Sequence, residues 1–248
     1  MTAKIEIRNL RKVYATAERR VHALEGINLA VEEGEFVSFV GLSGCGKTTL
    51  LNILAGFVGI THGEILMDGK PITPDYDKGV VFQEYALFPW LTALKNIEYG
   101  LKIRKVPPRE REEIARKYLG LVGLEEFADF YPHDLSGGMR QRVAVARALA
   151  FDPQVLLMDE PFGALDAQTR EDLQELTVDV WKKTGKTILY VTHNLSEAVY
   201  MGNRIVVFVP KPGRIREIVP VPLPRPRDAL SAEFISIQRH VNQLIRRS

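Results

Sequence analysis

The sequence predicts an α/β fold, in which a mainly parallel sheet is covered by helices and interrupted by a helical insert. Short β-rich runs separated by turn residues fill the first third of the chain, which predicts an antiparallel β part near the N-terminus. Residues 91–150 then have a mostly helical pattern. From residue 155 onward, apolar strand runs alternate with helical segments, and this alternation is typical of a parallel sheet with helices on its faces.

Strand patterns in the first third follow one another at short intervals. Ile5 and Ile7 alternate with charged residues, as in a half-buried strand. The apolar runs 27–31 and 36–40 are separated by four residues rich in glutamate, which predicts a β-hairpin. Two further short strands are expected at 63–67 and 79–82.

The rest of the chain supplies helices and buried strands. Pro107 and Pro108 open a helical pattern over residues 109–121, because proline suits the first turn of a helix. Apolar strands are expected at 155–158, 187–191 and 205–209. Prolines recur over residues 210–226, which indicates an extended or looped segment, and an amphipathic stretch follows over 230–245.

The composition is that of an ordinary globular protein, with 46% hydrophobic and 26% charged residues among 248. Lys and Arg number 33 and Asp and Glu 31, a formal net charge of +2, so bulk charge gives no support for a nucleic-acid partner. The single cysteine, Cys45, excludes an internal disulfide and suits a reducing compartment. The best apolar candidate for a membrane span, residues 50–60, is much shorter than the roughly 20 residues that a transmembrane helix needs.

Residues 41–48 match the pattern G-x-x-x-x-G-K-[ST] between an apolar strand and an apolar helical run. Glycines let the backbone wrap around a phosphate with its N–H groups inward, and the following helix turns its positive end toward the same anion. Lys47 is expected to reach the β- and γ-phosphates of a nucleotide, and the Thr48 hydroxyl to bind Mg²⁺. A glycine-rich turn without a ligand is the alternative, which the flanking strand and helix disfavour. The expected phosphate contacts are Gly41, Leu42, Ser43, Gly44, Cys45, Gly46, Lys47, Thr48 and Thr49.

A second candidate site is an apolar strand that ends in two carboxylates. Residues 155–158 are followed by Asp159 and Glu160, and α/β sheets bind their ligands at the carboxyl ends of strands. We expect Asp159 to hold Mg²⁺, often through water, and Glu160 to orient or deprotonate a water molecule. A solvated acidic turn would be the better interpretation of this strand alone, but its pairing with the phosphate loop favours the catalytic one.

Residues 135–142, Leu-Ser-Gly-Gly-Met-Arg-Gln-Arg, distinguish this chain from other proteins with a phosphate loop. This segment lies just upstream of the acidic strand and resembles the signature motif of ABC-type ATPases. Ser136 is a good N-cap, so the helix that follows presents a second anion-binding N-terminus. The resemblance covers about residues 4–209 and implies a P-loop NTPase (RecA-like) core.

The same resemblance assigns roles to single residues. Tyr14 matches the aromatic that stacks on adenine, and Gln83 matches the glutamine that contacts Mg²⁺ and the attacking water. His193 matches the switch histidine at the γ-phosphate. The residues Ser136, Gly137, Gly138 and Gln141 of the signature motif and Asp166, from the loop that links the two sites of a dimer, are implied to bind ATP. The histidines that match no motif, His22, His62, His133 and His240, are expected to be structural or exposed.

The implied protein is a two-lobed ATPase that dimerises head to tail, most simply as a homodimer. Each ATP would lie between the phosphate loop of one chain and the signature motif of the other. Within a single domain over residues 1–248, the resemblance implies a core of 1–86 and 152–220, a helical signature part of 87–151 and a short tail of 221–248.

Two functions are open to such an ATPase, the motor subunit of a membrane transporter and a soluble ABC-type ATPase of DNA repair or translation. The chain has one ATPase unit, no heptad arm and no basic tract, which favours the transporter. Residues 85–90, Tyr-Ala-Leu-Phe-Pro-Trp, lie where the family meets its permease, so a permease is expected to dock between Gln83 and Trp90. Ordinary packing of Phe88 and Trp90 within the helical part is the alternative.

The tail around Pro222 is similar to that of ATPases of the nitrate, sulfonate and taurine importer group, and its two arginines are compatible with a solvated segment. The resemblance implies a peripheral subunit on the cytoplasmic face of a prokaryotic inner membrane. It would work with a permease and, indirectly, with an extracytoplasmic solute-binding protein. Asn194 stands where the family usually has Asp after the switch histidine, which leaves the role of His193 intact but can change its local support.

Overall fold

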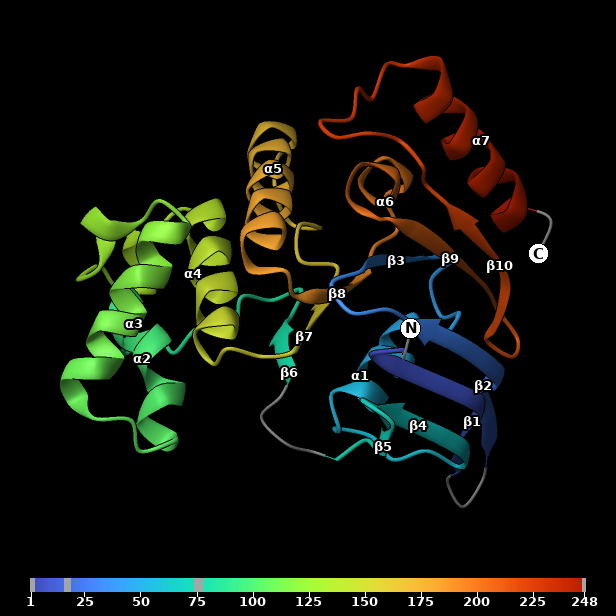
Figure 1. The fold of residues 1–248 in the computed structure, drawn as a ribbon, viewed down its shortest axis with the longest axis horizontal. Coiled ribbons are helices and arrows are strands. Elements are labelled where there is room, and N and C mark those ends of the chain that lie inside the picture. Colours follow the sequence, from blue (N-terminus) through green and yellow to red (C-terminus); the bar gives the residue numbers. More distant parts are fainter. Residues whose placement is uncertain (1–2, 16–18, 74–77, 247–248) are drawn as a thin grey trace. The chain divides into compact units, whose positions relative to one another are not determined.

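The computed structural model describes residues 3–15, 19–73 and 78–246 of the chain (Figure 1). The chain divides into two compact units. The first consists of Met1–Asp75 and Lys186–Ser248, and the second of Tyr76–Gly185. Both units contain helices and parallel strands, so the predicted α/β fold is confirmed.

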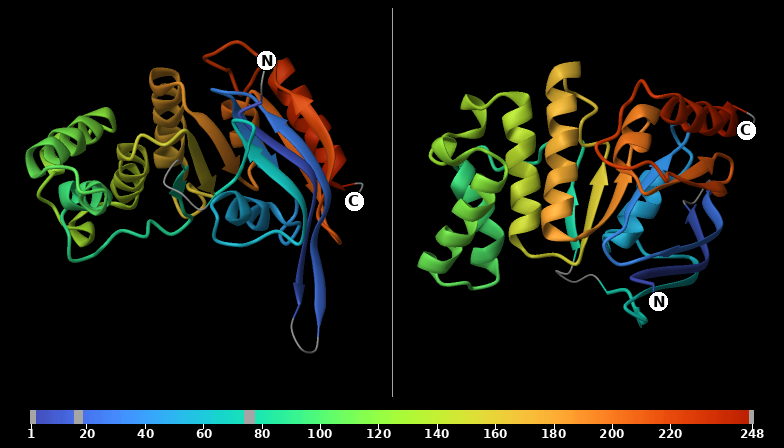
Figure 2. Two further views of the ribbon diagram at one scale, coloured as in Figure 1. Left: turned by 60° about the horizontal axis from the view of Figure 1, so that its bottom comes forward. Right: turned by 45° about the horizontal axis from the view of Figure 1, so that its top comes forward.

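The first unit contains an antiparallel sheet with the strand order β2-β1-β4-β5. β1 (Ile5–Ala15) pairs with β2 (Arg20–Val31), and the two form the long blue ribbon in the left-hand view of Figure 2. β4 (His62–Met67) and β5 (Lys70–Pro71) complete the sheet. Ile5 and Ile7 are buried on one face, as their alternation with charged residues predicts.

Four more strands of the first unit have the order β10-β9-β3-β8. β3 (Phe36–Val40) runs parallel to both β8 (Thr187–Val191) and β9 (Arg204–Val209). β10 (Arg214–Pro220), within the proline-rich region, pairs antiparallel with β9. All residues of β3 and β8 are buried, which explains why both sequences are continuous apolar runs.

The predicted hairpin around residues 32–35 is wrong. β2 pairs with β1, whereas β3 pairs with β8 and β9 in the parallel arrangement, so the turn connects two different sheets. The reason lies in burial. β2 alternates between buried and exposed positions near its end, but β3 is buried at every position and needs a strand on each side.

Three helices belong to the first unit: α1 (Lys47–Leu54), α6 (Leu195–Met201) and α7 (Ala232–Arg246). α7 is formed by most of the amphipathic stretch at residues 230–245. Its buried residues Phe234 and Val241 pack in one apolar cluster with Val207 of β9 and Val219 of β10. The C-terminal segment is therefore part of the hydrophobic core of this unit.

The arginines of the tail are not solvated, contrary to the sequence-based interpretation. Arg227 is 8% exposed and donates to the backbone carbonyls of Val199 at 2.6 Å, Gly202 at 2.6 Å and Val221 at 3.0 Å. Arg225 donates to the carbonyls of Tyr200 and Met201. Burial, with the nearby positive charge of Arg225, lowers the pKa of Arg227 to about 10, so the Arg227 side chain stays charged at neutral pH. Both arginines bind the carbonyl end of α6, where the helix dipole favours cations.

The second unit contains the parallel strands β6 (Lys78–Val81) and β7 (Val155–Asp159). Its helices are α2 (Ala93–Ile103), α3 (Pro108–Leu121), α4 (Gly137–Ala150) and α5 (Ala167–Thr184), with short 3₁₀ turns at Glu125–Phe127 and Pro132–Asp134. An apolar core joins α2, α3 and α4 through residues that include Ile97, Leu119 and Val143. The mostly helical pattern predicted for residues 91–150 is confirmed.

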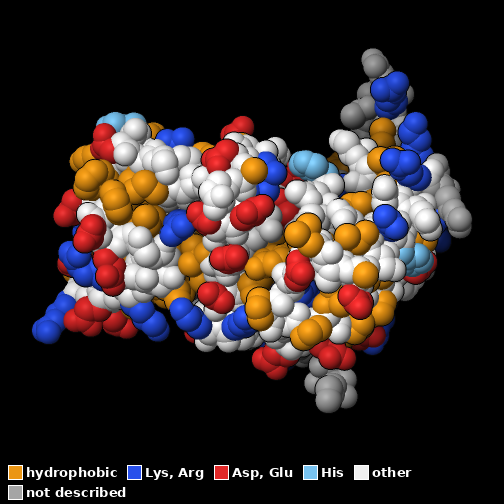
Figure 3. Space-filling view, turned by 90° about the horizontal axis from the view of Figure 1, so that it is seen from above, with side chains coloured by type: hydrophobic (Ala, Val, Ile, Leu, Met, Phe, Trp, Pro, Cys, Tyr) orange, Lys and Arg blue, Asp and Glu red, His pale blue; other side chains and the backbone are white. Residues whose placement is uncertain are grey.

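No helix within the described ranges is both long enough and apolar enough to cross a membrane. On the face drawn in Figure 3, acidic and basic side chains are interspersed, with apolar side chains between them. This agrees with the near-zero net charge of the whole sequence.

Candidate active site

The phosphate loop follows directly after β3, and two of its glycines cannot be replaced without strain. Gly41 and Gly46 have φ angles of 152° and 96°. A Cβ atom at Gly41 would lie 2.5 Å from the carbonyl oxygen of Phe208, and one at Gly46 would lie 2.5 Å from a methyl group of Leu24. The packing of the loop against its own unit therefore requires glycine at both positions.

Lys47, the first residue of α1, is folded back into the loop. Its ammonium group donates to the carbonyl oxygens of Gly41 at 2.9 Å and Leu42 at 3.2 Å, and it lies 3.5 Å from the sulfur of Cys45. The side chains of Leu42 and Ser43 at the tip of the loop are exposed, whereas Lys47 and Cys45 are buried. A positive charge is thus held among backbone carbonyls at the start of a helix, where an anion is favoured.

His193 lies at the same edge of the sheet as the phosphate loop. β3 and β8 are parallel, with Phe39 opposite Val191, so the loop after β3 and the turn after β8 leave the same end of neighbouring strands. The His193 side chain is exposed there. Tyr14 belongs to β1 of the antiparallel sheet. Its ring is 39% exposed, and the ammonium group of Lys12 lies 4.7 Å from the ring centre.

Gln83, Asp159 and Glu160 form a second set of polar residues, in the second unit. β6 and β7 are parallel with Val81 opposite Met158, so all three residues follow the carboxyl ends of neighbouring strands. Glu160 has a φ angle of 45°, which is uncommon for a residue with a side chain. Its carbonyl oxygen accepts a hydrogen bond of 3.1 Å from the N–H of Gly163. A Cβ atom at Gly163 would lie 3.8 Å from the amide nitrogen of Gln83, so the loop after Glu160 lies beside Gln83.

The signature motif begins α4 as expected. The hydroxyl of Ser136 caps the helix by accepting from the N–H of Met139 at 3.2 Å. A Cβ atom at Gly138 would lie 2.4 Å from the methyl group of Thr169, so α4 and α5 approach closely at their first turns. Asp166 caps α5 by accepting from the N–H of Thr169 at 3.0 Å, and this hydrogen bond lowers the pKa of its carboxyl group. Two helix N-termini thus lie together in this unit.

Gln141 differs from the other residues of the motif because its side chain is buried rather than presented at the helix end. It is fully buried, and within the described part of the chain its amide oxygen and nitrogen have no hydrogen-bond partner. The prediction that Gln141 binds ATP stays a prediction.

Two arginines of α4 bind the segment that follows Gln83. Arg147 donates to the carbonyl oxygens of Ala86 at 2.6 Å and Tyr85 at 3.3 Å, and the Arg140 guanidinium lies 5.1 Å from the ring centre of Tyr85. Burial lowers the pKa of Arg147. No motif in the sequence assigns a role to either arginine, although their spacing of seven residues on one helix places them on one face.

The apolar residues of this segment have different environments. Phe88 is half-buried, with its ring centre 4.5 Å from that of Tyr99, whereas Trp90 is 69% exposed. Inward packing therefore accounts for Phe88 but not for Trp90. The four histidines that match no motif are all exposed, as expected, and His240 lies 2.8 Å from a carboxylate oxygen of Glu217.

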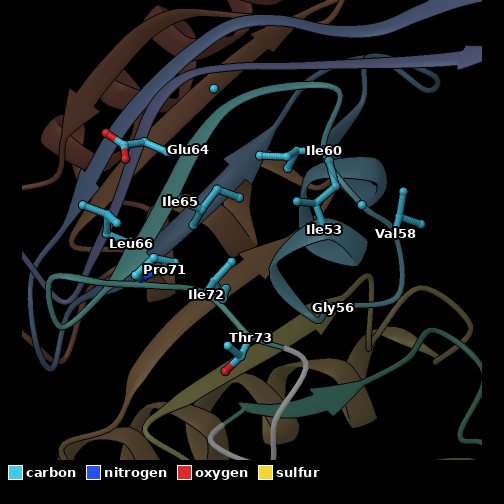
Figure 4. A pocket seen from close by; sticks show the side chains of 12 residues that line it. Ile53, Gly56, Val58, Ile60, Glu64, Ile65, Leu66, Pro71, Ile72 and Thr73 are labelled. Atoms are coloured by element: carbon cyan, nitrogen blue, oxygen red, sulfur yellow. The ribbon is translucent and has the colours of Figure 1, made fainter.

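The first unit also contains an apolar cavity of about 330 Å³, which is lined by residues outside the phosphate loop (Figure 4). It lies between the segment after α1 and the strands β4 and β5. Its lining includes Ile53, Val58, Ile60, Ile65, Leu66 and Ile72. The described residues that line it include no lysine or arginine.

The residue types at the two strand edges suit Mg²⁺. The described residues contain no cluster of three or more His, Cys, Asp and Glu side chains that could form a metal cage. Mg²⁺ does not need such a cage, because in nucleotide sites it is bound by one or two protein oxygens and by phosphate oxygens. The Thr48 hydroxyl, the Gln83 amide oxygen and the Asp159 carboxylate are ligands of that kind.

Comparison with known proteins decides the family. Residues 24–163 match the family model described as ABC transporter. The chain belongs to this family. This chain is 51% identical over 247 residues to an uncharacterized ABC transporter ATP-binding protein of Methanocaldococcus jannaschii. The match covers 99% of this chain and 92% of that protein.

Two relatives of this chain are named as import ATP-binding proteins. A taurine import ATP-binding protein of Rhizobium johnstonii is 50% identical over 198 residues, which cover 79% of this chain and 76% of the relative. A nitrate import ATP-binding protein of Synechocystis is 45% identical over 236 residues, which cover 95% and 89%.

Among solved structures, this chain is similar to the ATP-binding cassette MJ0796. That structure is described as a dimer in a post-hydrolysis state bound to ADP and Pi. The TM-score is 0.77 at 38% identity, and the match covers 88% of this chain and 98% of that one. The resemblance to ABC-type ATPases and the predicted P-loop NTPase fold are thereby confirmed.

Proposed function

We propose that this chain is the ATP-hydrolysing subunit of a membrane importer for small solutes. The proposal rests on two sets of residues, each at the carboxyl edge of parallel strands: the phosphate loop with His193, and Gln83 with Asp159 and Glu160. The relatives named as import ATP-binding proteins support the direction of transport. The enzyme activity is ATP + H₂O → ADP + phosphate, coupled to transport.

Different residues are proposed to bind the phosphates, to take the proton of the attacking water and to position that water. The loop amides and Lys47 bind the phosphates once the Lys47 ammonium exchanges its carbonyl partners for phosphate oxygens. Glu160 accepts a hydrogen bond from the attacking water and takes its proton as the bond to the γ-phosphorus forms. His193 and Gln83 donate hydrogen bonds to the γ-phosphate and hold the water. Positioning and charge stabilisation account for most catalysis in phosphoryl transfer.

Thr48, Gln83 and Asp159 are the proposed ligands of Mg²⁺, which when bound neutralises charge on the phosphate oxygens. Tyr14 is proposed to stack on the adenine through the ring face opposite Lys12. The remaining loop residues and Thr49 are proposed contacts to ATP, as are Ser136, Gly137, Gly138, Gln141 and Asp166, with the signature residues acting on the ATP of a second chain.

A dimer of this chain is proposed as the working unit. The solved relative described as a dimer with ADP and Pi supports this, and so do the two capped helix N-termini of α4 and α5. The chain is proposed to act as a single cassette over residues 1–248, with a core of 1–86 and 152–220, a helical part of 87–151 and a tail of 221–248.

A permease is the proposed membrane partner, and it is proposed to dock on the segment from Gln83 to Trp90. This docking would place the chain on the cytoplasmic face of the membrane as a peripheral subunit. Exposure of Trp90 and the arginine contacts to Tyr85 and Ala86 support this surface. An extracytoplasmic binding protein would deliver the solute. The names of the two import relatives favour a small oxyanion such as nitrate or a sulfonate.

Affinity purification of the tagged chain from detergent-solubilised membranes of its native cells tests the transporter role. We expect an integral membrane protein to co-purify with the wild type and to be lost with Trp90→Ala. Leu230→Ala removes another exposed apolar side chain and is the control that should retain the partner. Recovery with ribosomes or DNA, and never with a membrane protein, would favour the DNA repair or translation role.

A further inference from the structure

Glu197 is a buried carboxylate to which the proposed ATP chemistry gives no role. It is 4% exposed and lies in the first turn of α6, the helix that begins directly after His193 and Asn194. The Glu197 side chain is enclosed by its own unit and is not presented at the surface where the proposed site lies. Any influence on hydrolysis has to pass through another residue.

Two buried hydroxyl groups donate to the same carboxylate oxygen of Glu197. The phenol of Tyr190 donates over 2.8 Å from within β8, and the hydroxyl of Thr192 donates over 2.6 Å. Tyr190 and Thr192 are 0% and 2% exposed. Hydrogen bonds to a carboxylate are stronger than neutral ones, so this group fixes the end of β8 to the start of α6.

The residues on both sides of His193 are held by this group. The Thr192 hydroxyl also accepts from the N–H of Asn194 at 3.0 Å. The Asn194 side chain caps α6 by accepting from the N–H groups of Ser196 at 2.9 Å and Glu197 at 3.3 Å. His193 is exposed between two neighbours whose side chains are both fixed.

We infer that Glu197 is a positioning residue, which sets the direction of the His193 side chain through Thr192. This inference rests on the proposed role of His193 at the γ-phosphate. Removal of the Glu197 carboxylate leaves the Thr192 hydroxyl without its acceptor and lets the turn rotate. A displacement of about 1 Å at a catalytic group costs up to about 100-fold in rate.

Matched threonine variants separate positioning from stability. Thr192→Val and Thr187→Val each remove one buried hydroxyl, Thr187 at the first residue of β8 and Thr192 directly after its last residue. The Thr187 hydroxyl accepts from the N–H of Gly34 at 3.0 Å, away from His193 in the sequence. We expect both variants to lose stability in thermal unfolding. Only Thr192→Val should lower kcat for ATP hydrolysis, by about 10-fold or more, with KM for ATP within about twofold of the wild type. Equal kcat in the two variants would overturn the inference.

A double-mutant cycle tests the path through His193. Glu197→Leu, which removes the acceptor oxygens and keeps a side chain of similar size, should lower kcat in the wild-type background, but change kcat less than about twofold in the His193→Ala background, because the residue that it positions is absent. Multiplicative losses would show that Glu197 acts independently of His193 and would overturn the inference. If His193→Ala itself keeps full turnover, the role proposed for His193 fails instead, so the two failures are distinguishable.

Discussion

Lys47 is proposed to exchange its carbonyl partners for phosphate oxygens when a nucleotide binds, and this exchange can be measured. In the structure its ammonium group holds the carbonyls of Gly41 and Leu42. We expect Lys47→Ala to weaken ATP binding at least about 10-fold, because the loop loses a positive charge that is directed into it, a loss of roughly 1.4 kcal/mol or more. Titration calorimetry checks this.

Lys70→Ala is the control for Lys47→Ala, because it removes an exposed lysine from the same unit and leaves the loop intact. ATP affinity should be unchanged in the control. Equal affinity in Lys47→Ala and the wild type would contradict the phosphate-loop assignment.

Glu160 combines a carboxylate with an unfavourable backbone conformation, a pairing that is concentrated at active sites. Glu160→Gln keeps the size and shape of the side chain but removes its ability to take a proton. We expect ATP affinity to be retained while kcat falls about 100-fold or more. Phosphate release under saturating ATP measures kcat, and near-normal turnover would remove Glu160 from the role of base.

At the scale of elements, the first turn of α5 depends on the charge of Asp166. The hydrogen bond from Thr169 lowers the pKa of this carboxyl in the folded protein. The ionised form therefore stabilises the fold at pH values above the ordinary pKa, and this stabilisation is lost as the pH falls through the folded pKa. Asp166→Asn keeps a capping oxygen but cannot titrate.

Urea unfolding at two pH values tests this cap. At pH 7 Asp166→Asn should be less stable than the wild type, and near pH 3 the difference in free energy of unfolding should shrink. A difference that is the same at both pH values would show that the charge of Asp166 contributes nothing to the helix end.

Arg147 connects α4 to the segment that follows Gln83, so the signature helix and the proposed permease surface are joined by one side chain. Arg147→Met keeps most of the apolar stem and removes the hydrogen bonds. We expect faster amide hydrogen exchange over residues 84–90, because that backbone loses its anchor. Arg109→Met, at a side chain that is 95% exposed, is the control. Unchanged exchange in Arg147→Met would show that other contacts hold the segment.

At the scale of the molecule, local sequence patterns predicted where the strands lie better than they predicted which strands pair. The alternation in β1 and the continuous apolar runs of β8 and β9 identified strands correctly, because burial on one or both faces determines residue type directly. The pairing of β2 with β3 was wrong, since a short turn between two strands carries no information on which sheet each one joins.

In the candidate site, too, features set by local sequence were predictable, whereas contacts with distant segments were not. The glycines of the phosphate loop and the Ser136 cap were predictable because each satisfies a local backbone requirement. The burial of Gln141 and the contacts of Arg227 were not, because they depend on segments that are distant in the sequence. A charged residue in a proline-rich tail is usually solvated, and only the carbonyl end of α6 makes Arg227 an exception.

Phosphate release from Mg–ATP by the purified wild-type chain tests most directly whether pairs of this chain hydrolyse ATP. We predict steady release whose rate per chain rises with protein concentration, because each complete site is proposed to need two chains. Lys47→Ala should abolish this release. Release no faster than in a protein-free blank, or equal release from the wild type and Lys47→Ala, would contradict this function.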